Sequence, residues 1–515
     1  MKKKIVAMLC MLALAVCAFA GCGGGDAESA ASTEFVIASN GALSAGLDPA
    51  TEYDGWETMR WGIGETLYVL DDNMTPQPFL ASDYDVSGDQ LTWTFIIKDG
   101  ITFHNGNPVD GNAVKGSIER LIANNERAAT DLNIASVAAD GQNVMITTNE
   151  PNASLVNSLC DPYACIVDAS VDTSAYDSCP IGTGPYKVES YTVDDSLNLS
   201  RNDAYWNGTP KMETVVVRQI PDQSTLSAAL QSGEINAAYG IPYSDLESFN
   251  SSEDFTVSQA ATSRVFMLYY NLNDPVMKDV EVRKAIGMAI DKEALGSVVL
   301  AGAGTATQAA FPSYLPYGDD ALMTNAMPFD VDGANAALEA AGYVDSDGDG
   351  IREKDGEKLS LKLVTYGRTG LPEQAEAVQS ALNDIGMDVS YQQYDSIGEV
   401  LESGDYSVCV YAFVTTPVGD PVNYLTTTMG TDQGSNFGGY SNPEVDAKLK
   451  ELTSEFDTEK RADLAIEIQQ LALGDVAYCY LTHLNMALVC QSNVTGINQS
   501  PSDYYIITVD TGFAE

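Results

Sequence analysis

The sequence is short of positive charge. Its 515 residues include 26 Lys and Arg and 2 His against 73 Asp and Glu, which gives a formal net charge of −47. A chain this acidic repels a polyanion over most of its surface, so binding to nucleic acid is excluded. The histidines are too few for a nickel site built from several imidazoles. The negative charge favours cationic ligands without specifying any of them.

The motifs of common catalytic centres are also missing. The sequence has no Gly-x-Ser-x-Gly elbow, no Walker A loop and no His-Glu-x-x-His. His104 lies in a glycine-bearing turn and His483 in a strand-like run, where a structural role is the more common one. We therefore predict a protein with no catalytic residue, no cofactor and no metal held by the protein alone. A hydrolase is kept as the less favoured alternative.

The N-terminus has the pattern of an export signal. Three lysines at 2–4 precede an apolar run over 5–19, and the small residues Ala20 and Gly21 stand directly before Cys22. This arrangement resembles a bacterial lipobox, so we expect residues 1–21 to be a lipoprotein signal peptide, Cys22 to be lipidated and 22–33 to be a flexible tether. An ordinary cleaved signal peptide is the alternative. The export signal gives an expected location that is extracytoplasmic, at the cell membrane. No later apolar run is long enough to span a bilayer.

Cysteines after Cys22 stand at six scattered positions. They are Cys160, Cys165, Cys179, Cys409, Cys479 and Cys490. An exported protein can form disulfides, but this number of thiols permits too many pairings to assign one. No Cys-x-x-Cys spacing and no neighbouring histidine supports zinc. We expect local disulfides or free buried thiols.

Hydrophobic periodicity predicts alternating strands and helices. The expected strands are 35–38, 90–98, 214–219, 265–272, 359–365 and 387–392, and the expected helices are 53–70, 224–232, 280–295, 372–385 and 443–473, the last with a break near Glu455. The segments from 359 to 392 form a β-α-β unit whose strands pair in parallel. With 45% hydrophobic residues and 515 residues in all, the chain is too large for one core. The fold class is therefore α/β, with more than one lobe.

Several short motifs then occur in an informative order. They are LDP (47–49), TWTF (92–95), FHNG (103–106), PIGTGPY (180–186), RNDAYW (201–206), IPD (220–222), ALQSGEI (229–235), VRKA (282–285) and GGYSNP (438–443). Together they resemble the family 5 bacterial extracellular solute-binding proteins, the peptide/nickel group. The motifs span nearly all of the chain that follows the tether.

This resemblance implies a two-lobe periplasmic-binding-protein type II fold, or Venus flytrap, with an extra subdomain in lobe I. Lobe I would comprise 34–265, with the extra subdomain at 76–180, lobe II would comprise 266–486, and 487–515 would return to lobe I. The implied function is capture of an oligopeptide or a nickel-type metal chelate for the permease and ATPase subunits of an ABC importer. We expect a monomer. A peptide-sensing receptor or chaperone on the same fold remains an alternative.

The segment 414–421 bears on the ligand. Peptide-binding members of the family often carry an Asp that pairs with the ligand amine a few residues before an Asp-Pro. Here Asp420 and Pro421 are kept, but Pro417 stands where that Asp would fall. The arrangement looks more like the nickel branch, although Val422 replaces the His that can follow Asp-Pro there. A carried metal would then arrive with its coordination sphere filled mostly by its chelator, and the protein would hold the complex by aromatic contacts and Arg–carboxylate bonds.

Ligand-binding candidates follow from their expected positions near the lobe junction. They are Tyr53, Trp56, Arg60, Arg264, Arg368, Tyr411, Phe413, Thr415 and Thr416. The first three fall at i, i+3 and i+7 of an expected helix and would share one face. Arg264 lies at the expected hinge, and Arg368 lies in a loop after a lobe II strand.

One further motif, DSDGDG at 345–350, resembles the beginning of an EF-hand calcium loop. The twelfth position of such a loop is Gly356 rather than Glu, and no incoming helix of the EF type is obvious. The sequence favours a structural turn over a calcium site.

Overall fold

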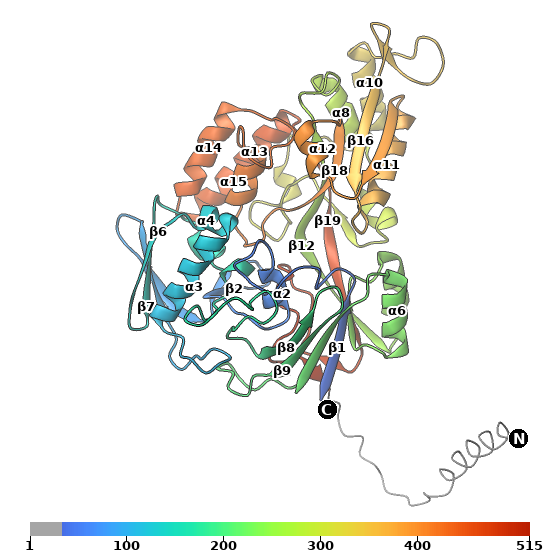
Figure 1. Ribbon diagram of the computed structural model, residues 1–515. Helices are drawn as coiled ribbons and strands as arrows, with labels where there is room; N and C mark the ends of the chain where they lie inside the picture. The colour runs from blue at the N-terminus through green and yellow to red at the C-terminus, as the bar shows by residue number, and fades with distance from the viewer. Residues whose placement is uncertain (1–32, 515) are drawn as a thin grey trace, which may run out of the picture. The chain divides into compact units, whose positions relative to one another are not determined.

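Two long antiparallel strands, β12 (Phe255–Tyr270) and β19 (Tyr478–Gln491), connect the two lobes in the computed structural model, which describes residues 33–514 (Figure 1). One end of this pair lies beside β11 and β1, and the other end lies beside β18 and β16. A continuous strand resists stretching but can bend or twist, so a pair of them suits a hinge. Cys22, the signal peptide and the tether up to residue 32 lie outside the described residues and remain predictions.

The central sheet is mixed. Its spatial order is β17 (Asp388–Tyr394), β16 (Ser360–Tyr366), β18 (Val408–Val414), β12, β19, β11 (Ala237–Tyr239), β1 (Glu34–Ser39), β10 (Thr214–Gln219), β9 (Ser196–Arg201) and β8 (Tyr186–Thr192), and β13 (Gly304–Ala306) pairs with β19 off this path. The predicted parallel β-α-β unit is confirmed, because α11 (Leu371–Asp384) joins β16 to the parallel β17. In lobe I, α6 (Gln223–Ser232) ends where the expected helix over 224–232 ends, at Gly233, which takes the left-handed conformation (φ 76°).

A second sheet forms the extra subdomain of lobe I. Its antiparallel order is β4 (Ala81–Val86), β5 (Thr92–Ile97), β7 (Asn143–Thr148) and β6 (Ile134–Asp140), and the helices α3 (Gly111–Asn124) and α4 (Glu126–Leu132) accompany it. Strand β5 alternates as its sequence predicts, with Trp93, Phe95 and Ile97 buried. These elements fall within the range 76–180, whose boundaries stay a prediction, as do those of the lobes.

Helices cover lobe II. They include α8 (Val280–Ala289), α10 (Val331–Ala340), α13 (Val422–Met429), α14 (Pro443–Ser454) and α15 (Thr458–Gly474). The predicted break near Glu455 is confirmed, because Glu455 is extended and the Asp457 side chain caps the next helix. The helix expected over 280–295 ends early, since Ile290 is extended and Asp291 caps a new turn.

The remaining elements are short. They are α2 (Gly55–Arg60), β2 (Tyr68–Leu70), β3 (Pro76–Pro78), α5 (Leu155–Ser158), the 3-10 turns Pro162–Ala164, Tyr243–Asp245 and Asp320–Leu322, α7 (Leu246–Asn250), α9 (Lys292–Ala294), the π-helical turn Leu295–Val299, β14 (Glu353–Lys354), β15 (Glu357–Lys358), α12 (Gly398–Ser403), β20 (Val494–Thr495) and β21 (Gly512–Phe513). Among the described helices, none combines the length and the apolar composition needed to cross a bilayer.

The prediction of one long helix over 53–70 was wrong. Only α2 is helical, and the chain leaves the helix at Gly62, whose φ of 72° is left-handed. The next residues pack backbone to backbone against the glycine-rich motif: Gly184 N–H donates to Ile63 O at 3.0 Å, and a Cβ on Gly184 would lie 2.3 Å from Gly62 O. Apolar spacing alone did not reveal this tertiary contact.

That contact also gives the motif residues a structural role, as expected. Tyr186 N–H donates to Gly62 O at 3.1 Å, and Nε2 of His104 lies 3.1 Å from Gly184 O. The described cysteines are all free, and all but Cys179 are buried. Of the two expectations for the thiols, the structure therefore supports free thiols.

Candidate ligand-binding site

On the lobe I side of the junction, Arg60 is already paired. It ends α2, and its Nη2 lies 2.9 Å from Oδ2 of Asp503, which also accepts a hydrogen bond from the Tyr239 hydroxyl at 2.7 Å. Its guanidinium lies 5.6 Å from the Trp56 ring and 5.3 Å from the Tyr239 ring. Arg60 thus holds the return segment of the chain against α2 through its ion pair with Asp503.

Trp56 and Tyr53 follow this pair toward the junction. The Trp56 ring packs edge-on against Tyr504 at 5.1 Å, and both the buried Trp56 Nε1 and the buried Tyr504 hydroxyl lack a hydrogen-bond partner within residues 33–514. Two donors without acceptors in the same place are costly unless a ligand or water supplies an acceptor. Tyr53 lies before the helix, is 63% exposed, and its ring lies 4.6 Å from the Arg127 guanidinium.

Arg264, on β12 at the expected hinge, lies close to Arg368, which follows β16 in lobe II. Burial, and then the positive charge of Arg368, lower the pKa of Arg264 to about 10. Every other arginine in residues 33–514 donates its guanidinium to a carboxylate or to backbone carbonyls. Within the same range, these two form neither an ion pair nor a side-chain hydrogen bond, and the Nε of Arg264 is buried. Two neighbouring cations without an ion-pair partner are a candidate site for an anionic ligand.

Aromatic rings extend from these arginines along β18. Tyr366 and Tyr411 lie 5.5 Å apart, Tyr411 and Phe413 lie 6.1 Å apart, and Phe413 meets Tyr424 at 5.0 Å. Burial is the main cause that raises the pKa of Tyr411 to about 12, and the positive charge of Arg368 opposes the rise. The rings form one chain of aromatic contacts from Tyr366 to Tyr424.

The segment after β18 is occupied by internal contacts. The Thr415 hydroxyl donates to Ser263 O at 3.1 Å, and Thr415 and Thr416 are both fully buried. Asp420 is ion-paired with Arg461 and accepts a hydrogen bond from the Ser154 hydroxyl at 3.0 Å. This segment therefore presents no free carboxylate to a ligand amine.

Most of the predicted residues thus gather in one region. Arg368, Tyr411 and Phe413 form its lobe II side, Arg264 lies at the expected hinge, and Trp56 with Arg60 forms its lobe I side, whereas Thr415 and Thr416 are fully buried. Their role in binding stays a prediction. Sequence reasoning missed Tyr239, which ends β11, and also Asp503 and Tyr504, which reach the site through the return of the chain after β19. None of the three belongs to a motif.

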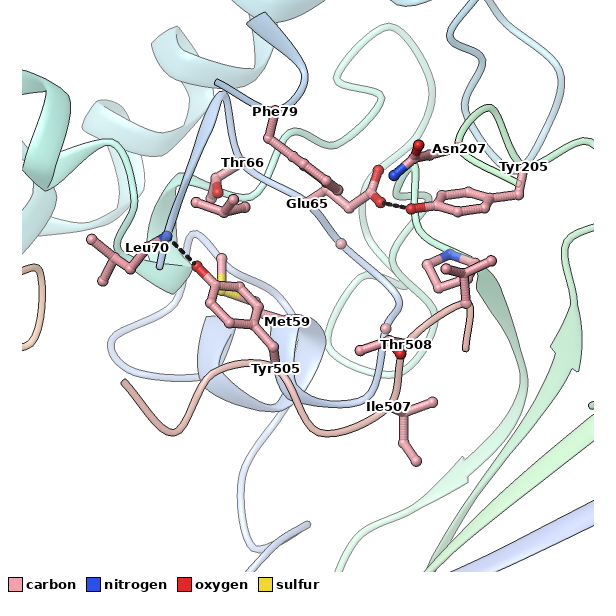
Figure 2. A pocket seen from close by; sticks show the side chains of 15 residues that line it. Met59, Glu65, Thr66, Leu70, Phe79, Tyr205, Asn207, Tyr505, Ile507 and Thr508 are labelled. Carbon is pink, nitrogen blue, oxygen red and sulfur yellow. Dashed lines mark hydrogen bonds between the residues drawn. The ribbon is translucent and has the colours of Figure 1, made fainter. Parts of the chain in front are cut away.

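A separate cavity lies inside lobe I. It has a volume of about 240 Å³ and is lined by residues that include Met59, Tyr205 and Tyr505. Figure 2 shows the Tyr205 hydroxyl donating to Glu65, and the Leu70 N–H donating to the Tyr505 hydroxyl oxygen at 3.0 Å. Burial raises the pKa of Glu65 to about 7, opposed by hydrogen bonds from Trp206, Tyr205 and Thr183. None of the predicted ligand-binding residues lines this cavity.

Comparison with known proteins then identifies the family. Residues 75–436 match the sequence profile described as "Bacterial extracellular solute-binding proteins, family 5 Middle". The chain belongs to this family. The prediction made from the motifs is therefore confirmed, and so is the two-lobe type II fold.

Three relatives show the range of the family. The chain is 25% identical over 452 residues to the nickel-binding protein NikA of Staphylococcus aureus, which covers 87% of this chain and 89% of the relative. It is 23% identical over 485 residues to the glutathione-binding protein GsiB of Pectobacterium atrosepticum, with 90% and 91% covered. A crystal structure of a nickel ABC transporter from Bacillus halodurans is 30% identical, covers 93% of this chain and 99% of its own, and has a TM-score of 0.77. The family is one of extracellular solute-binding proteins, which agrees with the predicted class.

Proposed function

We propose that this member of the family captures one small, carboxylate-bearing ligand between its lobes, foremost a nickel-type metal chelate, and delivers it to the permease and ATPase subunits of an ABC importer. The observation that carries the proposal is the unpaired arginine pair, Arg264 and Arg368. Guanidinium groups bind carboxylates through two parallel hydrogen bonds. A ligand carboxylate would also relieve the repulsion between the two cations, so it contributes more here than at an isolated arginine.

The same geometry disfavours a ligand chosen by its positive amine. Pro417 takes the place of the amine-binding Asp, Asp420 is held by Arg461 and Ser154, and Asp503 is held by Arg60. A free ammonium group would lose its hydration without gaining a carboxylate partner. The aromatic rings beside the arginines offer flat apolar surface to the body of the ligand instead.

A metal would come as a complex. His483 is buried, and burial lowers the pKa of His483 to about 4, while His104 is engaged with Gly184 in lobe I. The protein thus offers no cluster of imidazoles to bare Ni²⁺. Chelators with amino-acid carboxylates fill the metal's coordination sphere and still present oxygen atoms to the arginines. Two relatives, at 25% and 30% identity, are named for nickel, which supports this choice.

Contacts across the junction support capture by closure. The Asn157 amide donates to Val418 O at 2.9 Å, and the Asn423 amide donates to Asp131 Oδ1 at 3.0 Å. Each of these bonds joins a residue of the predicted lobe I to one of the predicted lobe II. A ligand that touches both sides binds the closed form more tightly and shifts the population toward it. Capture and release is then the whole activity, and we propose no chemical step.

Titration calorimetry with four probes tests the ligand class. The probes are the nickel(II) complex of L-histidine, Ni²⁺ alone, glutathione, and a tripeptide amide that has a free amine and no carboxylate. We expect one chelate per chain, no binding of Ni²⁺ alone, and no binding of the amide. Glutathione, which carries two carboxylates, is the matched acidic peptide. If the amide or bare Ni²⁺ bound most tightly, the proposed recognition by arginine would be wrong.

We also propose a lipid anchor at Cys22 and a monomeric state. The basic run at 2–4, the apolar run at 5–19 and the residues Ala20-Gly21-Cys22 support the anchor. A single lipid modification site at the end of a Gly-, Ala- and Ser-rich tether would keep the binding lobes close to the importer. Labelling with a radioactive fatty acid should mark the wild-type protein and not Cys22→Ala, and light scattering should give the mass of one chain.

A further inference from the structure

The loop between α10 and β16, in the upper part of Figure 1, gathers four carboxylates. Asp345, Asp347, Asp349 and Glu353 each bring an oxygen to a point where all four oxygens lie within 4.8 Å of one another. Two oxygens on opposite sides of one Ca²⁺ are about 4.6–5.2 Å apart, because each bond is about 2.3–2.6 Å long. The four oxygens can therefore contact a single Ca²⁺.

Glu353 makes this more than a group of exposed acids. It begins β14, is only 9% exposed, and its Oε2 accepts hydrogen bonds from the Ser346 backbone N–H and hydroxyl, both at 2.9 Å. Its Oε1 is buried and has no hydrogen-bond partner within residues 33–514. A buried carboxylate oxygen with nothing to accept is costly, and here it is carried by a residue that belongs to the group of four.

Neighbouring cations do not neutralise Glu353. The adjacent Arg352 points away and donates to the carbonyls of Tyr343 and Ile385, and Lys354 pairs with Asp279. Lys358 is ion-paired with Asp349, and the side chain of Lys358 is 47% exposed. One exposed lysine against four carboxylates leaves a large negative charge at the loop.

We propose that this loop binds one Ca²⁺ through Asp345, Asp347, Asp349 and the buried Oε1 of Glu353. Hard oxygen ligands and several carboxylates favour Ca²⁺, whereas Mg²⁺ keeps most of its waters and takes fewer carboxylates. The ion would replace Lys358 as the partner of Asp349 and fasten the β14–β15 hairpin to the end of α10. This role in lobe II is independent of the ligand captured between the lobes.

Calorimetric titration of CaCl₂ into the purified protein, freed of metal with EDTA, tests the site. We expect one site per chain with a Kd of about 0.1–1 mM, the range of extracellular calcium modules. Asp347→Asn should weaken binding by at least about tenfold, because it removes one charged ligand. The matched control is Asp355→Asn, which lies in the same hairpin outside the group and has a φ of 55° that Asn also tolerates.

Two more variants separate binding from folding. Glu353→Gln should lose Ca²⁺ binding while its thermal midpoint in EDTA stays equal to or above that of the wild type, since a buried charge is removed. Lys358→Met should bind Ca²⁺ more tightly, because the competing cation is gone. The proposal is overturned if the wild type shows no heat and no thermal stabilisation at about 10 mM Ca²⁺, or if Asp347→Asn and Asp355→Asn weaken binding equally.

Discussion

Replacing Arg264 by methionine should have opposite effects on the stability of the ligand-free protein and on its affinity for ligand. The pKa of Arg264 is lowered from 12.5 to about 10, first by burial and then by Arg368. Since one pKa unit corresponds to about 1.4 kcal/mol, holding this charge in the folded protein costs on the order of 3 kcal/mol. The cost is fully present below pH 10 and is relieved as pH rises toward 12.5.

At pH 7, Arg264→Met should therefore raise the free energy of unfolding of the ligand-free protein by up to about 3 kcal/mol. The same change removes a charge-assisted hydrogen bond to the ligand, a contribution of about 1.5–3 kcal/mol, so the Kd should rise about 10- to 150-fold. Urea unfolding of the ligand-free protein measures the first effect. Calorimetry with the nickel–histidine complex measures the second.

Two further arginines provide the controls. Arg368→Met should weaken ligand binding in the same way but should raise the free energy of unfolding by less, because the burial of Arg264, the larger cause of its cost, remains. Arg218→Met breaks an exposed ion pair, with side chains 41% and 62% exposed for Arg218 and Glu234, and should change stability by less than about 1 kcal/mol without affecting the ligand. A destabilised Arg264→Met protein with unchanged ligand affinity would refute the reasoning.

Two other predictions concern closure and pH. Gly419 has a φ of 72°, and a Cβ on it would lie 1.9 Å from Met74 O across the junction. Gly419→Ala should therefore prevent full closure and weaken ligand binding in calorimetry. The control is Gly398→Ala, which should leave binding unchanged because nothing lies within 4 Å of a Cβ there. Burial raises the pKa of Glu65 from 4.5 to about 7. The folded protein then holds a proton that the unfolded chain has released, and this group's contribution falls by about 3 kcal/mol as pH rises from 4.5 through 7. Glu65→Gln should abolish that slope in unfolding experiments, and a retained slope would assign it to another group.

The sequence predicted the fold where local and tertiary preferences agree. The β-branched run at 214–219, the glycine stop at Gly233 and the break near Glu455 each have a local cause, and the structure confirms all three. The prediction of a helix over 53–70 was wrong because Gly182 and Gly184 pack closely against the backbone that follows α2. That contact joins segments more than a hundred residues apart, and periodicity carries no information about it.

The site divides in a similar way. The order of the motifs was enough to locate the lobe junction and to place Arg264 and Arg368 beside it. Their lack of a partner could not be predicted, because it depends on where every carboxylate of the chain lies in space. Asp503, for instance, forms its ion pair with Arg60 and not with Arg264, and its position follows from the return of the chain after β19.

Native mass spectrometry of the protein purified from the organism that makes it tests the central claim most directly. The account predicts one small carboxylate-bearing ligand per chain, retained by the wild type and lost from the double variant Arg264→Met, Arg368→Met. A wild-type protein that carries no ligand and gains none from the nickel–histidine complex or glutathione, or a double variant that retains its ligand, would contradict it.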